Sequence, residues 1–179
     1  AEKLKIKIIN HPINLGQGAA IETGLKYFLS HKKFKYVITF DADGQHDASE
    51  ALNMLLLAKK TRSSAVLGSR FLEKKNAKMV PFFKKIILKL AIFYERIFYK
   101  INLTDAHNGL RVLSRDIILK HILPISNYDM SHATEITQKI IKSGKKVNEY
   151  SVNITYESIE SQAPLNAINI VVSNLFQPK

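Results

Sequence analysis

The fold is decided by YVITFDADGQHD, residues 36–47, in which a short hydrophobic run ends abruptly at an acidic loop. The run from Tyr36 to Phe40 is wholly β-branched or aromatic, which is typical of a strand buried on both faces of a parallel sheet. Ligands of open α/β sheets bind beyond the carboxyl ends of the strands, where Asp41 and Asp43 stand. Two carboxylates one residue apart repel each other unless a cation or a proton lies between them. The stretch therefore predicts a ligand-binding loop at the edge of an α/β sheet.

Gln45 adds a neutral oxygen two residues after Asp43. Asp41, Asp43 and Gln45 would together supply oxygen ligands to a hard divalent cation, Mg2+ or Mn2+. The alternative is a solvated turn whose aspartates cap the next helix, because Asp-x-Asp is a common pattern. His46 is either a ligand or base, or a hydrogen-bond donor to one of the neighbouring acids.

Strands and helices alternate along the rest of the chain, which predicts a mostly parallel, Rossmann-like sheet flanked by helices. The expected strands cover residues 5–9, at an edge, and residues 36–40, 65–70 and 147–156. The expected helices begin after Gly18, after Ser49 as N-cap and after Ser114, and two more cover residues 132–143 and 164–176. We expect an α/β domain over residues 1–157 and an amphipathic C-terminal helix within a tail over 158–179.

The composition excludes several classes of protein. The 179 residues contain 46% hydrophobic and 23% charged residues, which is the range of one globular domain and not of a disordered chain. The chain has no cysteine, so disulfides, thiolate zinc sites and cysteine nucleophiles are excluded. The 27 Lys and Arg residues against 15 Asp and Glu residues give a net charge of +12, which favours polyanionic partners. No recognised nucleic-acid motif accompanies this charge, so nucleic acid is not an expected partner.

The segment from Met79 to Leu103 predicts a helix that is apolar over most of its surface and carries a basic stripe. The stripe consists of Lys85, Lys89, Arg96 and Lys100. A cationic helix rich in aromatic residues suits the interface of an anionic membrane. A helix of the core or of a homo-oligomer is the alternative that the same pattern allows.

A glycine turn precedes the first predicted helix. Gly16 and Gly18 resemble part of a dinucleotide-binding motif, but Ile21 occupies the third glycine position, which argues against a Rossmann cofactor site. Gly16, Gly18 and Ala19 would let a donor phosphate approach the unpaired N–H groups of the helix N-terminus. A tight turn needed only for packing is the alternative.

Four motifs together resemble one family. NLGQGAAIETGL, VITFDADGQHD, VLGSRF and TDAHNGLRVLSRD occur in the order found in GT-A-fold family 2 glycosyltransferases of the dolichyl-phosphate-mannose-synthase-like branch. The resemblance covers about residues 9–156. It implies that Asp41, Asp43 and Gln45 hold the metal on the donor diphosphate. It also implies that Arg70 contacts phosphate, and that Asp105 and Arg111 are the functional residues of the last motif.

The chain departs from this family at both ends. Members open with two strands that hold the nucleoside, so roughly 50 to 60 residues of the usual layout are absent and an N-terminally truncated domain is expected. After Tyr156, relatives often continue with a Lys-Gly-Gln segment that this chain lacks. Turnover by this chain alone is therefore in question.

The resemblance implies a metal-dependent, inverting transfer of a sugar from a nucleotide-sugar donor to a polyprenyl phosphate or a glycan, in bacterial cell-envelope synthesis. A hydroxyl acceptor needs a general base, for which Asp105 is the first candidate and Glu135 the second. A phosphate acceptor needs none, because it is largely ionised at neutral pH. Glu135 and His132, three residues apart on one helix, are expected to shape the substrate site. The expected location is the cytoplasm, peripherally at the inner face of the membrane.

The main alternative is a non-catalytic remnant that keeps a surface for an anionic membrane or a partner protein but has no donor site.

Overall fold

The computed structural model describes residues 6–73, 80, 82–99, 102–105, 107–129 and 131–154. Its four strands lie in the order β1-β3-β2-β4, with bounds β1 (Tyr36–Thr39), β2 (Ala65–Ser69), β3 (Arg111–Ser114) and β4 (Val147–Ser151). Strand β3 is antiparallel to β1 and β2, and β4 is parallel to β2. Three of the described strands therefore share one direction. The expected α/β class is confirmed, but the sheet is mixed, because the reversed strand β3 is inserted between β1 and β2.

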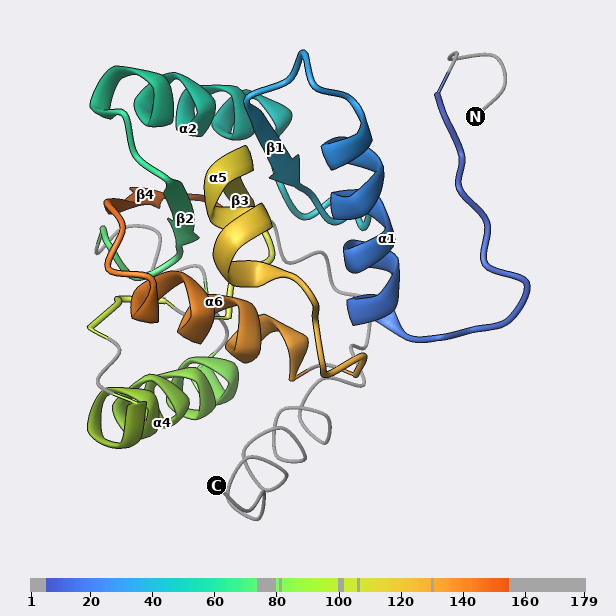
Figure 1. The fold of residues 1–179 in the computed structure, drawn as a ribbon. Coiled ribbons are helices and arrows are strands. Elements are labelled where there is room, and N and C mark those ends of the chain that lie inside the picture. Colours follow the sequence, from blue (N-terminus) through green and yellow to red (C-terminus); the bar gives the residue numbers. More distant parts are fainter. Residues whose placement is uncertain are drawn as a thin grey trace.

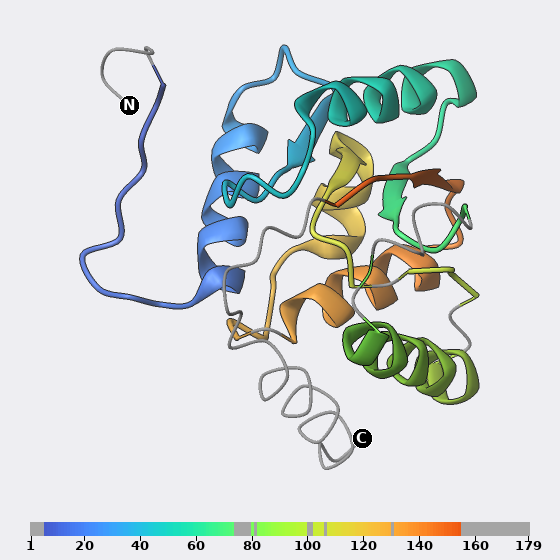
Figure 2. The ribbon, with the colours of Figure 1, turned by 180° about the vertical axis from the view of Figure 1, so that it is seen from behind.

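Helices cover both faces of this sheet (Figures 1 and 2). The helices are α1 (Gln17–Ser30), α2 (Ala48–Thr61), α4 (Phe82–Tyr99), α5 (Arg115–Ile117), the π-helical turn η2 (Ile118–Ile122) and α6 (His132–Lys142). Helix α2 packs on one face, and α1, α6 and the α5–η2 segment pack on the other. Helix α4 lies outside these layers, at the lower edge of Figure 1.

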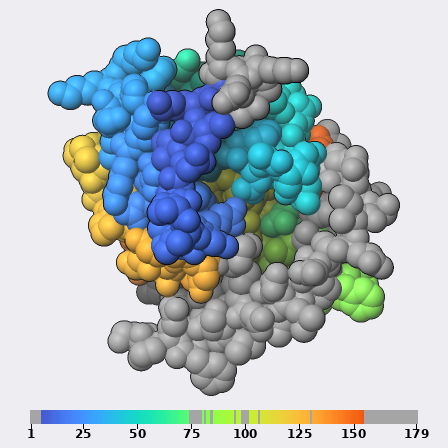
Figure 3. Space-filling view, turned by 90° about the vertical axis from the view of Figure 1, so that its right-hand side faces the viewer, coloured from blue at the N-terminus to red at the C-terminus, as the bar shows by residue number. Residues whose placement is uncertain are grey.

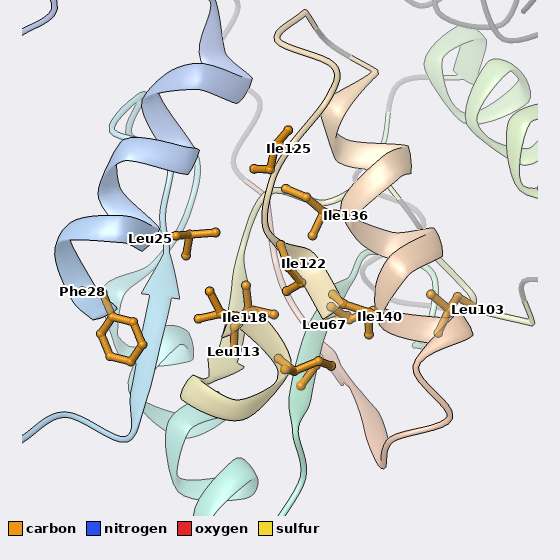
Figure 4. Packing of buried hydrophobic residues seen from close by; sticks show 12 residues of the cluster. Leu25, Phe28, Leu67, Leu103, Leu113, Ile118, Ile122, Ile125, Ile136 and Ile140 are labelled. Atoms are coloured by element: carbon orange, nitrogen blue, oxygen red, sulfur yellow. The ribbon is translucent and has the colours of Figure 1, made fainter. Parts of the chain in front are cut away.

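Alternate residues of each strand enter the two cores. Leu67 and Leu113 point into the larger core, where they meet the isoleucines of η2 and α6 and Leu25 and Phe28 of α1 (Figure 4). Val66 and Val112, one residue away in each strand, point into the smaller core against Met54 of α2. Because consecutive strand residues face opposite sides, a sheet covered on both faces needs the continuous hydrophobic runs seen in the sequence.

Two sequence-based expectations about local structure were wrong, and a third element was missed. The described residues 6–9 form no strand, because no described strand offers them hydrogen-bond partners. The α2 N-cap is Asp47, whose side chain accepts a hydrogen bond from Ser49 N at 2.8 Å, whereas Ser49 lies inside the helix. Strand β3 had not been expected, although the predicted cap after it is confirmed: Ser114 Oγ accepts from Ile117 N.

The N-terminal segment runs along the outside of α1 (Figure 3). His11 Nε2 and Thr23 Oγ1 are joined by a hydrogen bond of 2.9 Å, and the segment and α1 line an open hollow of about 610 Å3. The expected helix at 132–143 is confirmed by α6, and Gly144 after it adopts a φ of 64°. The predicted tail helix at 164–176 lies outside the described residues.

Candidate active site

The end of β1 opens into a pocket of about 270 Å3 that holds residues of three of the four motifs. Its apolar wall comes from α1 and β1, and its polar lining is formed by Gln17, Thr39, Asp41, His107, Arg111 and His132. Arg111 reaches this position because it pairs with Thr39 across the β1–β3 ladder, 72 residues along the chain (111 − 39). The reversed strand thus brings the last motif to the acidic loop.

The acidic loop itself is largely open to solvent. Asp43 is exposed and its Oδ1 accepts a hydrogen bond from Gln45 N at 3.0 Å, while Asp41 and Gln45 are half-buried. Gln17 Nε2, at the start of α1, donates to Asp41 Oδ1 at 3.3 Å. The backbone of Gly109 lies so close to the Asp41 carboxylate that there is no room for a side chain at position 109. The sequence did not single out Gln17 or Gly109 for this contact.

Arg70 and Asp105 form a buried bidentate ion pair. Arg70 Nε donates to Asp105 Oδ2 at 2.5 Å and Nη2 donates to Oδ1 at 2.7 Å. The residues are 6% and 1% exposed, so this pair is desolvated. Burial alone would raise the pKa of Asp105, but the charge and the hydrogen bonds of Arg70 outweigh burial and lower that pKa. The pair therefore keeps Asp105 ionised and orients the Arg70 guanidinium.

Glu149 holds the segment that carries Asp105, a role that the sequence analysis missed. Its Oε1 accepts hydrogen bonds from Thr104 N at 2.8 Å, Thr104 Oγ1 at 2.7 Å and Asp105 N at 3.3 Å. Thr104 Oγ1 also contacts Ser69 Oγ at 2.6 Å. The strands β2 and β4 thereby fix the ion pair. Glutamate within an alternating strand is an ordinary pattern, so no local signal distinguishes Glu149.

Arg111 is a buried cation beneath the pocket. The residue is 2% exposed, and its Nη2 donates to Ala133 O of α6 at 3.3 Å. The sheet and α6 thus restrict the conformation of the Arg111 side chain, and a contact between Arg111 and a donor phosphate stays a prediction.

Three histidines connect these charged groups, and burial lowers the pKa of each. The pKa of His107 falls to about 4, and the charges that act on it belong to Asp105, Arg70 and Arg111. His132 is influenced by Arg111 and Asp41, and His46 by Asp41, Asp43 and Arg70, among other groups. Asp41, Asp43, Asp105 and both arginines therefore all act electrostatically on this group of histidines. His107 was missed by the sequence analysis, although it stands inside the quoted TDAHNGLR motif.

The glycine turn lies against the loop before α6. Gly18 N donates to Tyr128 O at 3.0 Å, and a Cβ at Gly16 or Gly18 would lie 2.3 or 2.4 Å from the carbonyl oxygens of Tyr128 and Asn127. Ala19 is buried in the same helix turn. The tight turn therefore meets a packing need, because a side chain at Gly16 or Gly18 would collide with these carbonyl groups. A donor contact at Gly16, Gly18 or Ala19 stays a prediction.

Glu135 holds that same loop. Its carboxylate accepts hydrogen bonds from Ser126 N at 2.9 Å and from Asn127 N and Nδ2, both at 2.8 Å, and it pairs with Lys139 Nζ at 2.7 Å. Burial would raise the pKa of Glu135, but the hydrogen bonds from Lys139, Ser126 and Asn127 outweigh burial and lower that pKa. No described contact joins Glu135 to the cluster around Asp41. Its role as a base stays a prediction.

The donor set of the acidic loop fits a hard cation by its chemistry. Asp41 and Asp43 offer carboxylates and Gln45 an amide oxygen, which are ligands suited to Mg2+ or Mn2+. Within the described residues, no group of three or more His, Cys, Asp or Glu side chains is placed to hold a metal. A cation here would therefore need oxygens from the amide, from water and from a bound diphosphate.

Comparison with known proteins places this arrangement in a family. The sequence profile of glycosyl transferase family 2 matches residues 1–122. The uncharacterized protein MJ1222 of Methanocaldococcus jannaschii is 30% identical over 170 residues, which cover 94% of this chain and 69% of that protein.

Two further relatives have named activities. A polyprenol monophosphomannose synthase of Mycolicibacterium smegmatis is 24% identical over 87% of this chain and 58% of its own length. A UDP-N-acetylglucosamine–dolichyl-phosphate N-acetylglucosaminyltransferase of Methanococcus voltae is 29% identical over 85% of this chain and 60% of its own length. The chain thus spans well under two thirds of these two relatives. The predicted family and branch are confirmed, and the chain belongs to glycosyl transferase family 2.

Proposed function

We propose that this chain carries the diphosphate-binding and acceptor-binding part of a metal-dependent, inverting glycosyltransferase that moves a sugar from a nucleotide-sugar donor to a polyprenyl phosphate. The observation that carries the proposal is the convergence of Asp41, Arg111 and the Arg70–Asp105 pair at one end of the sheet. The named relatives support this donor and acceptor chemistry. One comes from Mycolicibacterium smegmatis and the other from Methanococcus voltae, so the proposed reaction is not tied to bacteria.

In this reaction an acceptor oxygen forms a bond to the anomeric carbon while the bond from that carbon to the donor diphosphate breaks. A divalent cation, when bound by Asp41, Asp43 and Gln45, supplies positive charge that neutralises the departing diphosphate. Arg111 adds a fixed positive charge beside the same loop. Asp105 holds the guanidinium of Arg70 in one orientation for a phosphate group.

The state of the two carboxylates that could act as bases supports a phosphate acceptor. Asp105 is bound on both oxygens by Arg70, and Glu135 is bound by Lys139 and the loop at 126–127. The pKa of each is lowered, so each is a weaker base than an ordinary carboxylate. A phosphate monoester carries its own negative charge and needs no base. For a glycan acceptor, by contrast, one of these carboxylates must act as the base.

Calorimetric titration of a panel of nucleotide sugars, each with and without Mn2+, tests the donor site. We expect one nucleotide sugar to bind only with Mn2+, and Asp43→Asn to abolish that binding. Binding that is equally strong in Asp43→Asn would contradict the metal assignment. No heat with any nucleotide sugar would favour the non-catalytic remnant.

Helix α4 supports a membrane surface as the place where the acceptor is met. Its exposed large apolar residues fall within an arc of about 100° when successive residues are spaced at the helical angle, and they are Phe82, Phe83, Ile86, Leu90, Phe93 and Ile97. Ala91, on the opposite side of the helix, is buried. Lys85, Lys89 and Arg96 border the apolar arc. No helix in the described part of the chain is both long and apolar enough to cross a bilayer. We infer that α4 lies in the interface of an anionic membrane at the cytoplasmic face.

Sedimentation with vesicles of anionic lipid tests this inference. The triple substitution of Lys85, Lys89 and Arg96 by glutamine is expected to reduce binding strongly. Substituting the exposed Lys32, Lys33 and Lys35 by glutamine removes the same charge away from α4, and this control should retain most of the binding. An equal loss of vesicle binding in the two variants would show that binding depends only on the net charge of the chain and not on α4. A dimer of the unmodified chain in solution that does not bind vesicles would instead make α4 a homo-oligomer surface.

A further inference from the structure

We propose that Gly109 is a positioning residue for the Asp41 carboxylate, because its missing side chain is the space that this carboxylate occupies. The proposal rests on the proposed function in one respect, namely that Asp41 is a metal ligand. It adds that the last motif of the chain shapes the metal loop directly.

The contact between the two residues is close and involves the whole carboxyl group. A Cβ at Gly109 would lie 2.3 Å from Asp41 Oδ2, 3.1 Å from Cγ and 3.4 Å from Oδ1. The other carboxylate oxygen, Oδ1, accepts the hydrogen bond from Gln17 Nε2 at 3.3 Å. Asp41 is therefore restrained by an amide donor at Oδ1 and by the close approach of the Gly109 backbone at Oδ2.

The backbone of Gly109 is itself tied to the sheet. Thr39 Oγ1 donates to Gly109 O at 2.7 Å. The next residue, Leu110, donates its N–H to Asn108 Oδ1 at 2.9 Å and accepts from Gly68 N at 3.0 Å. Since the backbone is anchored on both β1 and β2, the end of the Asp41 side chain is the part that can move.

An alanine at this position is compatible with the backbone. Gly109 is not among the glycines with positive φ, which are Gly16, Gly44 and Gly144. The cost of Gly109→Ala therefore comes from the collision with the Asp41 carboxylate and not from backbone strain. The expected result is a folded protein whose Asp41 carboxylate has been displaced.

Displacing a group that orients a metal ligand typically weakens metal affinity about ten- to a hundredfold. We expect a loss of that size in Gly109→Ala, measured with Mn2+ alone by the electron paramagnetic resonance of free Mn2+. Gly24→Ala is the matched control, because a Cβ at Gly24 would meet nothing within 4 Å. It should bind Mn2+ like the unmodified chain. Mn2+ affinity in Gly109→Ala that equals this control would overturn the proposal.

A second measurement tests the contact without any metal. The change in melting temperature caused by Gly109→Ala is determined in the unmodified chain and in an Asp41→Ala background, both in the presence of a chelator. We expect a more negative change in the unmodified chain, because Asp41→Ala removes the colliding atoms. Equal changes in both backgrounds would overturn the proposal. If the unmodified chain binds no Mn2+ yet this coupling is found, the metal role of Asp41 fails while the positioning by Gly109 stands.

Discussion

Two segments of the site are built in opposite ways: the loop from Asp41 to Asp47 and the segment from Thr104 to Arg111. The loop is mostly exposed, and Asp43 and Asp47 bind N–H groups only two residues away. The segment buries Asp105 and Arg111, and its contacts reach β2, β4 and α6. The difference indicates that the fold fixes the side chains of Asp105 and Arg111, whereas the exposed side chain of Asp43 has more freedom to move.

The comparison predicts its largest effect at Asp105. Asp105→Asn leaves Arg70 buried without its anionic partner, and breaking a buried ion pair in this way costs about 3–5 kcal/mol. Urea unfolding of the variant should show this loss in the free energy of unfolding. A loss below about 0.5 kcal/mol, the size expected for an exposed residue, would mean that the Arg70–Asp105 ion pair does not stabilise the segment.

The pH dependence of stability gives the next largest effect, through His107. Its pKa is lowered to about 4 by burial, so the unfolded chain takes up a proton at a higher pH than the folded chain. Stability from this residue is fully present above pH 6.5 and declines as the pH falls toward 4, by about 3 kcal/mol in total. Urea unfolding across this pH range gives the free energy of unfolding of the unmodified chain and of His107→Gln. The advantage of the unmodified chain should become smaller as the pH falls. A difference in free energy of unfolding that stays constant with pH would contradict a lowered pKa of His107.

A smaller effect is expected at Glu149, which holds the segment through its backbone. Glu149→Ala leaves the N–H groups of Thr104 and Asp105 without this acceptor, which costs about 1–3 kcal/mol. Glu149→Gln keeps an oxygen at the same place and should lose less. Thermal unfolding of the two variants side by side provides the measurement, and equal losses would show that hydrogen bonding to Thr104 and Asp105 is not what Glu149 contributes.

The smallest effect on stability is expected in the open loop. Asp43→Asn changes an exposed side chain, so the free energy of unfolding should stay within about 0.5 kcal/mol of the unmodified chain. Urea unfolding in the presence of a chelator measures this. A large destabilisation would mean that the loop is as rigidly built as the segment from Thr104 to Arg111.

Part of this site could be predicted from sequence because its signals are local. The hydrophobic runs at β1 and β2 identify buried strands by composition alone, and the acids directly after β1 mark the candidate site loop. Strand β3 escaped prediction because only Val112 and Leu113 of its four residues are hydrophobic, and its pairing with β1 and β2 is what makes it a strand. Residues 6–9 show the converse: an alternating pattern forms no strand where no described partner is available.

The partners of the charged residues could not be predicted. Asp105 lies 35 residues from Arg70, and Glu149 lies 45 residues from Thr104. Nothing in the local sequence distinguishes an aspartate that will be a buried partner of an arginine from one that will be an exposed base. That distinction depends on which strands become neighbours.

The amino-acid sequence by itself determined the family, the α/β class and the position of the acidic loop, because these depend on hydrophobic period and on motifs within a few residues. Only the tertiary structure decided that Asp105 neutralises Arg70, that Glu149 holds the backbone of Thr104 and Asp105, and that Gly109 lies against the Asp41 carboxylate. These contacts join segments from different strands, and a reversed strand in the middle of the sheet brings them together.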